Sequence, residues 1–299
     1  MKNKKKTICC IIYSVILVIS CTAPLLKDIL SGKHDDIAFS EEYKNSPYYE
    51  RLQKALNDSG DSSVMERTLA AALSQEGYKN YAAFGIDIDK AKKDGLIWTG
   101  AELRCNSHGT GNTEYTRWAQ AYVSEEEEKQ LYKDCDWCAI FASWCMYQAG
   151  YYPGEEMKKY YYSYCADPRK EKEPENYITA FNLEQENVWY TPLARQKLKK
   201  YDWCTYPHEN IDPYAIPYKP GGLLFFTWDG TGKYFDHVGI VVSYDSENHV
   251  LTYTNGNSDG QVITRNMDLD LKENFLGHPL LRNSRRIMAY GEYNAPPSG

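Results

Sequence analysis

The feature that most limits the fold of this chain is a helix pattern at residues 137–148, followed later by a series of strand patterns. From Trp137, apolar residues recur at i+3, i+4, i+7 and i+8, and Gly150 is a stop signal. The composition, 42% hydrophobic and 25% charged, is that of an ordinary globular protein with one sizeable core.

Strand patterns fill the last third of the chain. Residues 222–228, 237–244 and 249–254 are rich in β-branched and aromatic residues, and turn-forming residues separate them. Residues 286–290 are a candidate fourth strand. Helices followed by an antiparallel meander indicate the α+β class.

The N-terminus has the form of a leader. Four lysines within the first six residues precede an apolar run, Ile8 to Ser20, and small residues follow. The sequence ending at Cys21 resembles a bacterial lipobox, in which Cys21 would be lipidated. The alternatives are an uncleaved transmembrane helix, about 20 residues long from Ile8, and plain secretion. We therefore expect residues 1–33 to be a signal peptide or membrane anchor, which places the body outside the cytoplasmic membrane.

The rest of the chain divides into a linker and one domain. Residues 34–60 are polar and lack long apolar stretches, so we expect a linker. The domain is predicted at 61–295; it begins with a capping box at Ser63–Glu66 and a helix of about 13 residues that ends at Gly77. Residues 151–215, rich in Tyr, Lys and Glu, have no clear periodicity and are long for a loop. We interpret them as an insertion, helical in part at 193–200.

Charge argues against a nucleic-acid partner. The formal net charge is −7, and residues 34–299 carry 28 basic against 40 acidic residues. Phosphate binding depends on clustered Lys and Arg, which this body lacks.

Cys138 lies in the first turn of the predicted helix, a position that favours a nucleophilic thiolate. A cysteine in the first turn of a helix has its thiolate favoured by the helix dipole, and the N–H groups there can receive an oxyanion. His237, which opens an apolar strand, is a candidate base. Asn255 and Asn257 follow the next strand, so a hairpin would bring either amide near the imidazole, where it could hold one tautomer.

Two other interpretations of Cys138 remain open on spacing alone. A buried cysteine in an apolar helix is usually a small hydrophobic residue. Cys135 and Cys138 also form a CxxC pair, which suits redox chemistry, but a second Cys/His pair at metal spacing and a thioredoxin-like strand are missing. No metal or cofactor is predicted, and the pairing of the nine cysteines stays open.

Several motifs in the right order carry a resemblance to a known family. Residues 136–150 (DWCAIFASWCMYQAG) resemble the nucleophile helix of the CHAP family, the cysteine, histidine-dependent amidohydrolases/peptidases. Residues 219–228 (KPGGLLFFTW) resemble its apolar strand, 236–241 (DHVGIV) its histidine strand, and 254–257 (TNGN) its usual IEGN. Weaker similarity is found at 74–78, 115–118 and 287–293.

The resemblance implies a papain-like fold and hydrolysis of an amide bond in peptidoglycan. Cys138 would form an acyl-enzyme, and His237 would take the thiol proton and later protonate the leaving amine. We expect Trp137, Tyr115 and Trp118 to contact the substrate. The scissile bond, that of a muramoyl-alanine amidase or of a stem-peptide or cross-bridge endopeptidase, is left open.

Two positions depart from the family pattern. Gly222 replaces the usual Asp, and Asn255 replaces the usual Glu. Because Asn supplies no negative charge, a weak or inactive wall-binding or scaffold module is the alternative function. We expect a Gram-positive host, in which the leader would hold the domain at the membrane face of the wall for local remodelling, by the cell or by secretion or conjugation machinery.

Overall fold

The structure is a computed structural model in which residues Phe39–Ala295 form one compact unit. It describes residues 37–79, 113–122, 137–151, 183, 187–191, 208–209, 211–227, 237–258, 260–273 and 281–294. Within these ranges, no helix has the length and hydropathy needed to cross a bilayer. The predicted leader, with Cys21, and Cys135 lie outside the described residues, as do residues 193–200.

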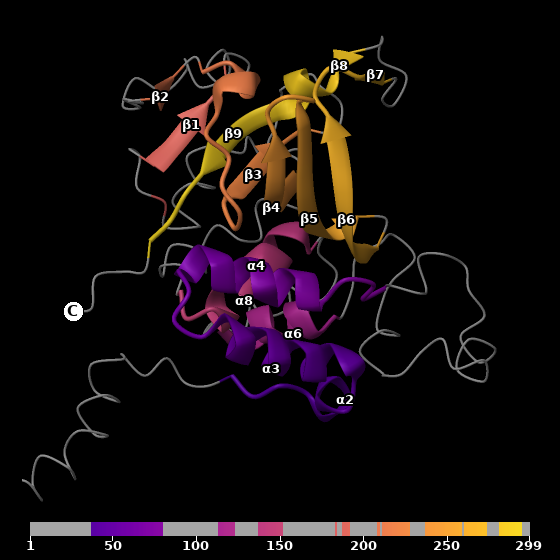
Figure 1. Cartoon of the computed structure of the whole chain (residues 1–299). Coiled ribbons are helices and arrows are strands. Elements are labelled where there is room, and N and C mark those ends of the chain that lie inside the picture. Colours follow the sequence, from indigo (N-terminus) through magenta and orange to yellow (C-terminus); the bar gives the residue numbers. More distant parts are fainter. Residues whose placement is uncertain are drawn as a thin grey trace, which may run out of the picture. The chain divides into compact units, whose positions relative to one another are not determined.

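The helices pack together beside the strands. They are α2 (Glu41–Lys44), α3 (Pro47–Ser59), α4 (Val64–Ser74), α6 (Glu114–Tyr122) and α8 (Cys138–Gln148). Figure 1 shows α4 and α8 next to the strands, with α2 and α3 beyond them. Helix α8 contacts α4 and α6 on one side and β4 and β5 on the other, so it lies at the centre of the unit.

Helix α8 is enclosed on all sides. Every residue from Cys138 to Met146 is buried, as expected for a helix that is apolar around its whole circumference. At its C-terminal end, Gly150 adopts a φ of +86°, and the Arg67 guanidinium donates two hydrogen bonds, of 3.0 and 2.7 Å, to the Ala149 carbonyl. This positive side chain thus provides hydrogen-bond donors for a carbonyl that has no partner within the helix.

The segment expected to be a polar linker, 34–60, differs from that expectation, because α2 and α3 form within it. The Ser40 and Ser46 side chains accept hydrogen bonds from Tyr43 N and Tyr49 N and so cap the two helices. Tyr43 itself is buried, as are Tyr48 and Leu52. The apolar contacts come from widely spaced tyrosines rather than from a continuous run, which is why the sequence looked unstructured.

Helix α4 begins as predicted and ends early. Ser63 and Glu66 form the reciprocal capping box. The helix ends at Ser74, before Gly77, because Gly77 N–H donates to Val262 O on strand β6.

The strands form one mixed sheet in the order β2-β1-β9-β3-β4-β5-β6. Their bounds are β1 Val188–Tyr190, β2 His208–Glu209, β3 Leu223–Phe226, β4 His237–Asp245, β5 Val250–Ser258, β6 Gln261–Asp268 and β9 Ile287–Gly291; β7 (Lys272–Glu273) pairs with β8 (Leu281–Arg282) separately. All neighbours are antiparallel except β1 and β2. With the helices, this confirms the α+β class.

The predicted strands all form, and the insertion adds to them. Strand β5 continues to Ser258, past the expected end at residue 254, so it includes Asn255. Strands β1 and β2 lie inside the segment 151–215, and β1 pairs with β9. The insertion therefore extends the sheet at one edge. The sequence did not indicate these strands, because the segment has no clear periodicity.

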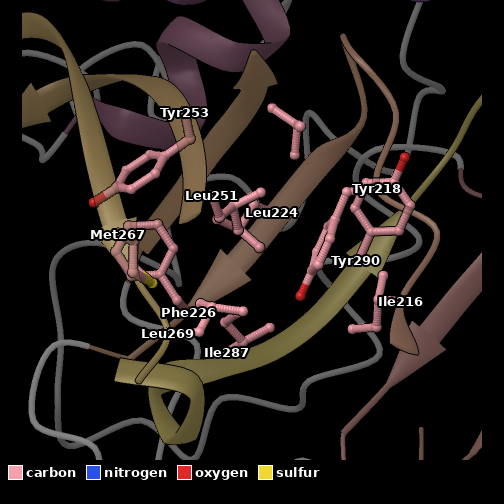
Figure 2. Packing of buried hydrophobic residues seen from close by; sticks show 11 residues of the cluster. Ile216, Tyr218, Leu224, Phe226, Leu251, Tyr253, Met267, Leu269, Ile287 and Tyr290 are labelled. Carbon is pink, nitrogen blue, oxygen red and sulfur yellow. The ribbon is translucent and has the colours of Figure 1, made fainter. Parts of the chain in front are cut away.

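Buried apolar residues of several strands form one core cluster. Figure 2 shows Phe226, Leu269 and Ile287 close together in this cluster, although β3, the residue after β6, and β9 supply them. The 3₁₀ helix η5 (Asn283–Arg286), just before β9, joins the end of β6 through a hydrogen bond of 3.1 Å from Ser284 N to Leu269 O.

Packing explains the glycine at position 222, where the CHAP pattern usually has Asp. A Cβ at Gly222 would lie 2.4 Å from the Tyr290 hydroxyl oxygen. That hydroxyl instead accepts a hydrogen bond of 2.9 Å from Lys219 N, in the turn before β3. Tyr290 thus fills the space beside the turn and satisfies one of its N–H groups.

Candidate active site

His237 and Asn255 meet inside the protein. His237 begins β4 and is 3% exposed; Asn255 lies on β5 and is 1% exposed. The distance from His237 Nε2 to Asn255 Oδ1 is 2.7 Å. Of the two predicted amides, Asn255 is therefore the one that contacts His237 Nε2, while Asn257, with a φ of +56°, lies in the irregular part of β5.

A second contact of the amide determines its orientation and the tautomer of the imidazole. Asn255 Nδ2 donates a hydrogen bond of 2.9 Å to Ile263 O on β6, so Oδ1 is the atom that faces His237. Because Oδ1 can only accept, His237 Nε2 must carry the proton. In the neutral imidazole, Nδ1 is then the basic nitrogen.

The β4–β5 hairpin sets this pairing. Its register places Ile240 opposite Thr254, and its turn is held by Asp245, which accepts from Glu247 N and Asn248 N. A slip of one residue would turn each side chain to the other face. The hairpin predicted from sequence is thus what brings the histidine and the amide together.

Cys138 is the first residue of α8. Trp137 is the N-cap and makes no side-chain cap hydrogen bond, and the bond from Phe141 N to Trp137 O, 2.9 Å long, opens the helix. The first N–H groups of a helix have no acceptor within it and carry its partial positive charge. Cys138 is 3% exposed, and its thiol forms no disulfide. The end of α8 can thus stabilise negative charge on sulfur or on an adjacent oxygen.

Strand β5 touches this helix end next to Asn255. A Cβ at Gly256 would lie 2.5 Å from Phe141 Cβ and 2.8 Å from Trp137 Cζ3. Glycine is therefore needed for the β5 backbone to approach the first turn of α8. As a result, the strand that holds His237 through Asn255 lies against the helix end that carries Cys138.

Tyr115, Trp118 and Trp137, expected to contact substrate, are core residues in this structure. Each is at most 1% exposed. The Tyr115 ring lies 5.4 Å from that of Trp137 and 4.9 Å from that of Trp144, between centroids. Within the described residues, these aromatic rings pack against one another between the helices, and their contact with a substrate stays a prediction.

Sequence reasoning missed Gln75, which joins several helices. Its Oε1 accepts from Tyr43 Oη at 2.8 Å and Tyr115 Oη at 3.2 Å, and its Nε2 donates to Tyr48 O and Ser74 Oγ. Burial raises the pKa of the Tyr43 and Tyr115 hydroxyls well above the usual value. The sequence feature that could have indicated this role is the position of Gln75 in residues 74–78, which have weak similarity to the CHAP family.

No three His, Cys, Asp or Glu side chains lie close enough together to hold a metal within the part of the chain that the structure describes.

Comparison with known families gives the class of protein. Residues 110–275 match the model of the family described as "Putative amidase domain", and this is more than half of the 299 residues. The chain belongs to that family, which indicates a hydrolase that cleaves amide bonds. The matched region contains Cys138, His237 and Asn255. No curated protein and no solved structure matches the chain.

Proposed function

We propose that this protein is a cysteine amidohydrolase that cleaves an amide bond of peptidoglycan, with Cys138 as nucleophile and His237 as base. One observation carries the proposal. The strand that holds the imidazole through Asn255, at 2.7 Å, also places Gly256 against Trp137, the N-cap of α8, and Phe141, in the same helix turn as Cys138.

The first half of the reaction uses the thiol and the imidazole. His237 Nδ1 takes the proton of the Cys138 thiol, and the thiolate attacks the amide carbon. The carbonyl oxygen becomes an oxyanion, which the N–H groups at the start of α8 stabilise. The protonated His237 then gives its proton to the leaving amine, the C–N bond breaks, and an acyl-enzyme remains on Cys138.

The second half returns the enzyme to its starting state. His237 Nδ1 takes a proton from water as the water oxygen attacks the thioester carbon. The C–S bond breaks, the carboxylic acid product leaves, and the proton on Nδ1 restores the thiol. Asn255 keeps Nε2 protonated and the ring oriented throughout, and does not itself exchange a proton.

The Asn in place of Glu suits this site. Asn255 must both accept from His237 and donate to Ile263 O. A carboxylate could accept from His237, but its second oxygen would face the carbonyl oxygen of Ile263 without a proton between them. This geometry favours a working neutral amide over the alternative of an inactive wall-binding or scaffold module.

The substrate and the location rest on sequence similarity. The CHAP resemblance supports peptidoglycan as the substrate. The acidic body implies that this anionic polymer is recognised by shape and hydrogen bonds. The leader at residues 1–33, with Cys21, supports a domain that is held outside the membrane of a Gram-positive cell, where it would remodel the wall locally, alone or with secretion or conjugation machinery.

The test is digestion of purified Gram-positive peptidoglycan by the full chain, kept in detergent, beside Cys138→Ala. Mass spectrometry of the released muropeptides identifies the bond. Freed lactyl groups indicate an amidase, and new peptide amino termini indicate an endopeptidase. Products that do not depend on Cys138 would refute the mechanism. An absence of products from several wall types, with the Cys138 thiol shown to be reduced, would favour the binding module.

A further inference from the structure

A phenyl ring packs against the imidazole of His237. Phe226, the last residue of β3, is directly opposite His237 in the β3–β4 register. The two ring centroids lie 5.0 Å apart, with an interplanar angle of 59°. The Phe226 ring also packs edge-on against Tyr253, at 5.2 Å. Hydrogen bonding through Asn255 restrains one ring atom of His237, and Phe226 restrains the plane of the ring.

A buried arginine lies over the same phenyl ring. Arg286 is 5% exposed, and its guanidinium carbon is 5.8 Å from the centroid of Phe226. Its Nε donates to Thr227 O at 3.3 Å, immediately after Phe226, and its Nη1 is 3.5 Å from Asn283 Oδ1. Arg286 therefore contacts both the ring and the backbone of the residue that follows it.

The strand pairing shows an irregularity at this position. The register between β3 and β9 shifts between Phe225 and Phe226, so that Phe226 is opposite Ile287, the residue after Arg286. Such β-bulges change the direction of a side chain and are frequent beside active sites. Here the shift accompanies the contacts of Phe226 with both His237 and Arg286.

We propose that Phe226 and Arg286 are positioning residues, which act through His237 to hold its Nδ1 in line with the Cys138 thiol. This inference rests on the proposed function. Asn255 alone leaves the imidazole able to tilt about its hydrogen bond, and a small displacement of Nδ1 is enough to weaken proton transfer. Phe226 blocks that tilt on one face, and Arg286 keeps the phenyl ring in place.

The test measures how fast iodoacetamide alkylates Cys138 as a function of pH, with mass spectrometry to identify the cysteine. The thiolate is the reactive form, so the profile reports the thiolate–imidazole pair without a substrate. The variants of the full chain are Phe226→Leu and Arg286→Met. The matched controls are Phe225→Leu, the same change at the buried neighbouring position, and Arg282→Met at an exposed position.

We expect Phe226→Leu to lower the alkylation rate near pH 6 by about tenfold, which is the loss of thiolate that a one-unit rise in thiol pKa would produce. The pH at which its alkylation rate rises should shift toward the value for His237→Ala, a third variant that lacks the imidazole. Arg286→Met should have a smaller effect in the same direction, because the phenyl ring remains. Thermal unfolding would show whether Phe226→Leu and Phe225→Leu lose similar stability.

Two results would overturn the inference, and they differ in meaning. If His237→Ala changes the profile but Phe226→Leu behaves like Phe225→Leu, the positioning role is refuted and the proposed function stands. If His237→Ala leaves the wild-type profile unchanged, both proposals fail, because there is no thiolate–imidazole pair to position.

Discussion

The carbonyl of Ile263 orients the side chain of Asn255 through an N–H···O bond of 2.9 Å. Because the amide nitrogen is engaged there, the amide oxygen faces His237 Nε2 at 2.7 Å. A backbone atom of β6 therefore selects an amide at this position and determines which nitrogen of the histidine is basic.

Asn255→Asp should lower kcat/KM for peptidoglycan by roughly tenfold or more, since the imidazole loses its orientation or its basic nitrogen. The free energy of unfolding should also fall by about 1–3 kcal/mol, because Ile263 O loses its hydrogen-bond donor. The control is Asn266→Asp, an exposed asparagine on β6 whose Oδ1 accepts from Thr252 Oγ1, a role that a carboxylate keeps. Equal activity in wild type and Asn255→Asp would contradict the orientation argument.

The two buried cysteines of α8 should behave differently. Burial raises the pKa of the Cys145 thiol well above its usual value, so it should resist iodoacetamide in the folded protein. Cys138→Ala should abolish hydrolysis, whereas Cys145→Ala should keep it and lose about 1 kcal/mol of stability. Peptide mass spectrometry after brief alkylation checks the labelling. Preferential labelling of Cys145 would reverse the assignment.

Gly256→Ala should reduce activity by more than the loss of stability of this variant can explain. Its methyl group would lie 2.5 Å from Phe141 Cβ, so β5 must move away from the start of α8. We expect a fall in kcat of roughly a hundredfold, in line with a displacement of about 1 Å at a catalytic group. Gly77→Ala is a suitable comparison: its φ of +86° makes alanine strained, but no atom lies within 4 Å of the added Cβ. Similar kinetics in the two variants would argue against a specific role for this contact.

Gly222→Ala should destabilise the fold by about 1–3 kcal/mol, because the added methyl group meets the rigid ring of Tyr290. Urea unfolding of both single variants and of Gly222→Ala/Tyr290→Leu forms a double-mutant cycle. The cost of the alanine should shrink in the Tyr290→Leu background. If the losses of stability of the two single variants simply add in the double variant, the contact with Tyr290 is not the reason for the glycine at position 222.

Stability should fall steeply above about pH 10. Burial raises the pKa of several tyrosine hydroxyls, those of Tyr43, Tyr115, Tyr218, Tyr290 and Tyr293, above the usual 10.0. A raised pKa in the folded state means that the contribution to stability is complete below the unfolded pKa. It is then lost as pH rises toward the folded value, because unfolding lets these groups ionise.

Ultraviolet absorbance of the tyrosinate form, followed with circular dichroism during an alkaline titration, checks this expectation. Exposed tyrosines should ionise first, and the later part of the tyrosinate signal, from the buried hydroxyls, should change together with the circular dichroism, since these hydroxyls ionise only when the protein unfolds. Ionisation of all tyrosines before any loss of secondary structure would show that these side chains are accessible to hydroxide in the folded state.

Local sequence patterns were sufficient for the elements that carry the candidate site. The periodicity from Trp137 predicted α8, and the alternation of apolar strands and turns predicted β3, β4, β5 and β9. Capping and turn signals act between residues that are close in the chain, so a sequence can show them directly. The choice of Cys138 and His237 as candidates also came from the sequence, through helix position and family resemblance.

Contacts between distant segments were decided by the tertiary structure. Tyr43 is buried because Gln75 and the rings of Phe39 and Trp144 contact it. The polar composition of the N-terminal segment did not reveal these contacts. Tyr115 and Trp118 are enclosed by the same packing, although aromatic residues in a loop-like region resembled a binding surface. Their burial depends on which helices meet, and that information is spread over the whole chain.

The sequence by itself determined the fold class and the choice of Cys138 and His237 as candidate reactive groups, because helix periodicity, strand alternation and a cysteine at a helix start are local properties. The tertiary structure alone decided which asparagine meets His237 and how its amide is turned. Both depend on the register of β4, β5 and β6, because Ile263 O on β6 accepts the hydrogen bond that turns the amide of Asn255. Pairing register and packing are properties of the assembled sheet, in which each residue's partner is set by all the others.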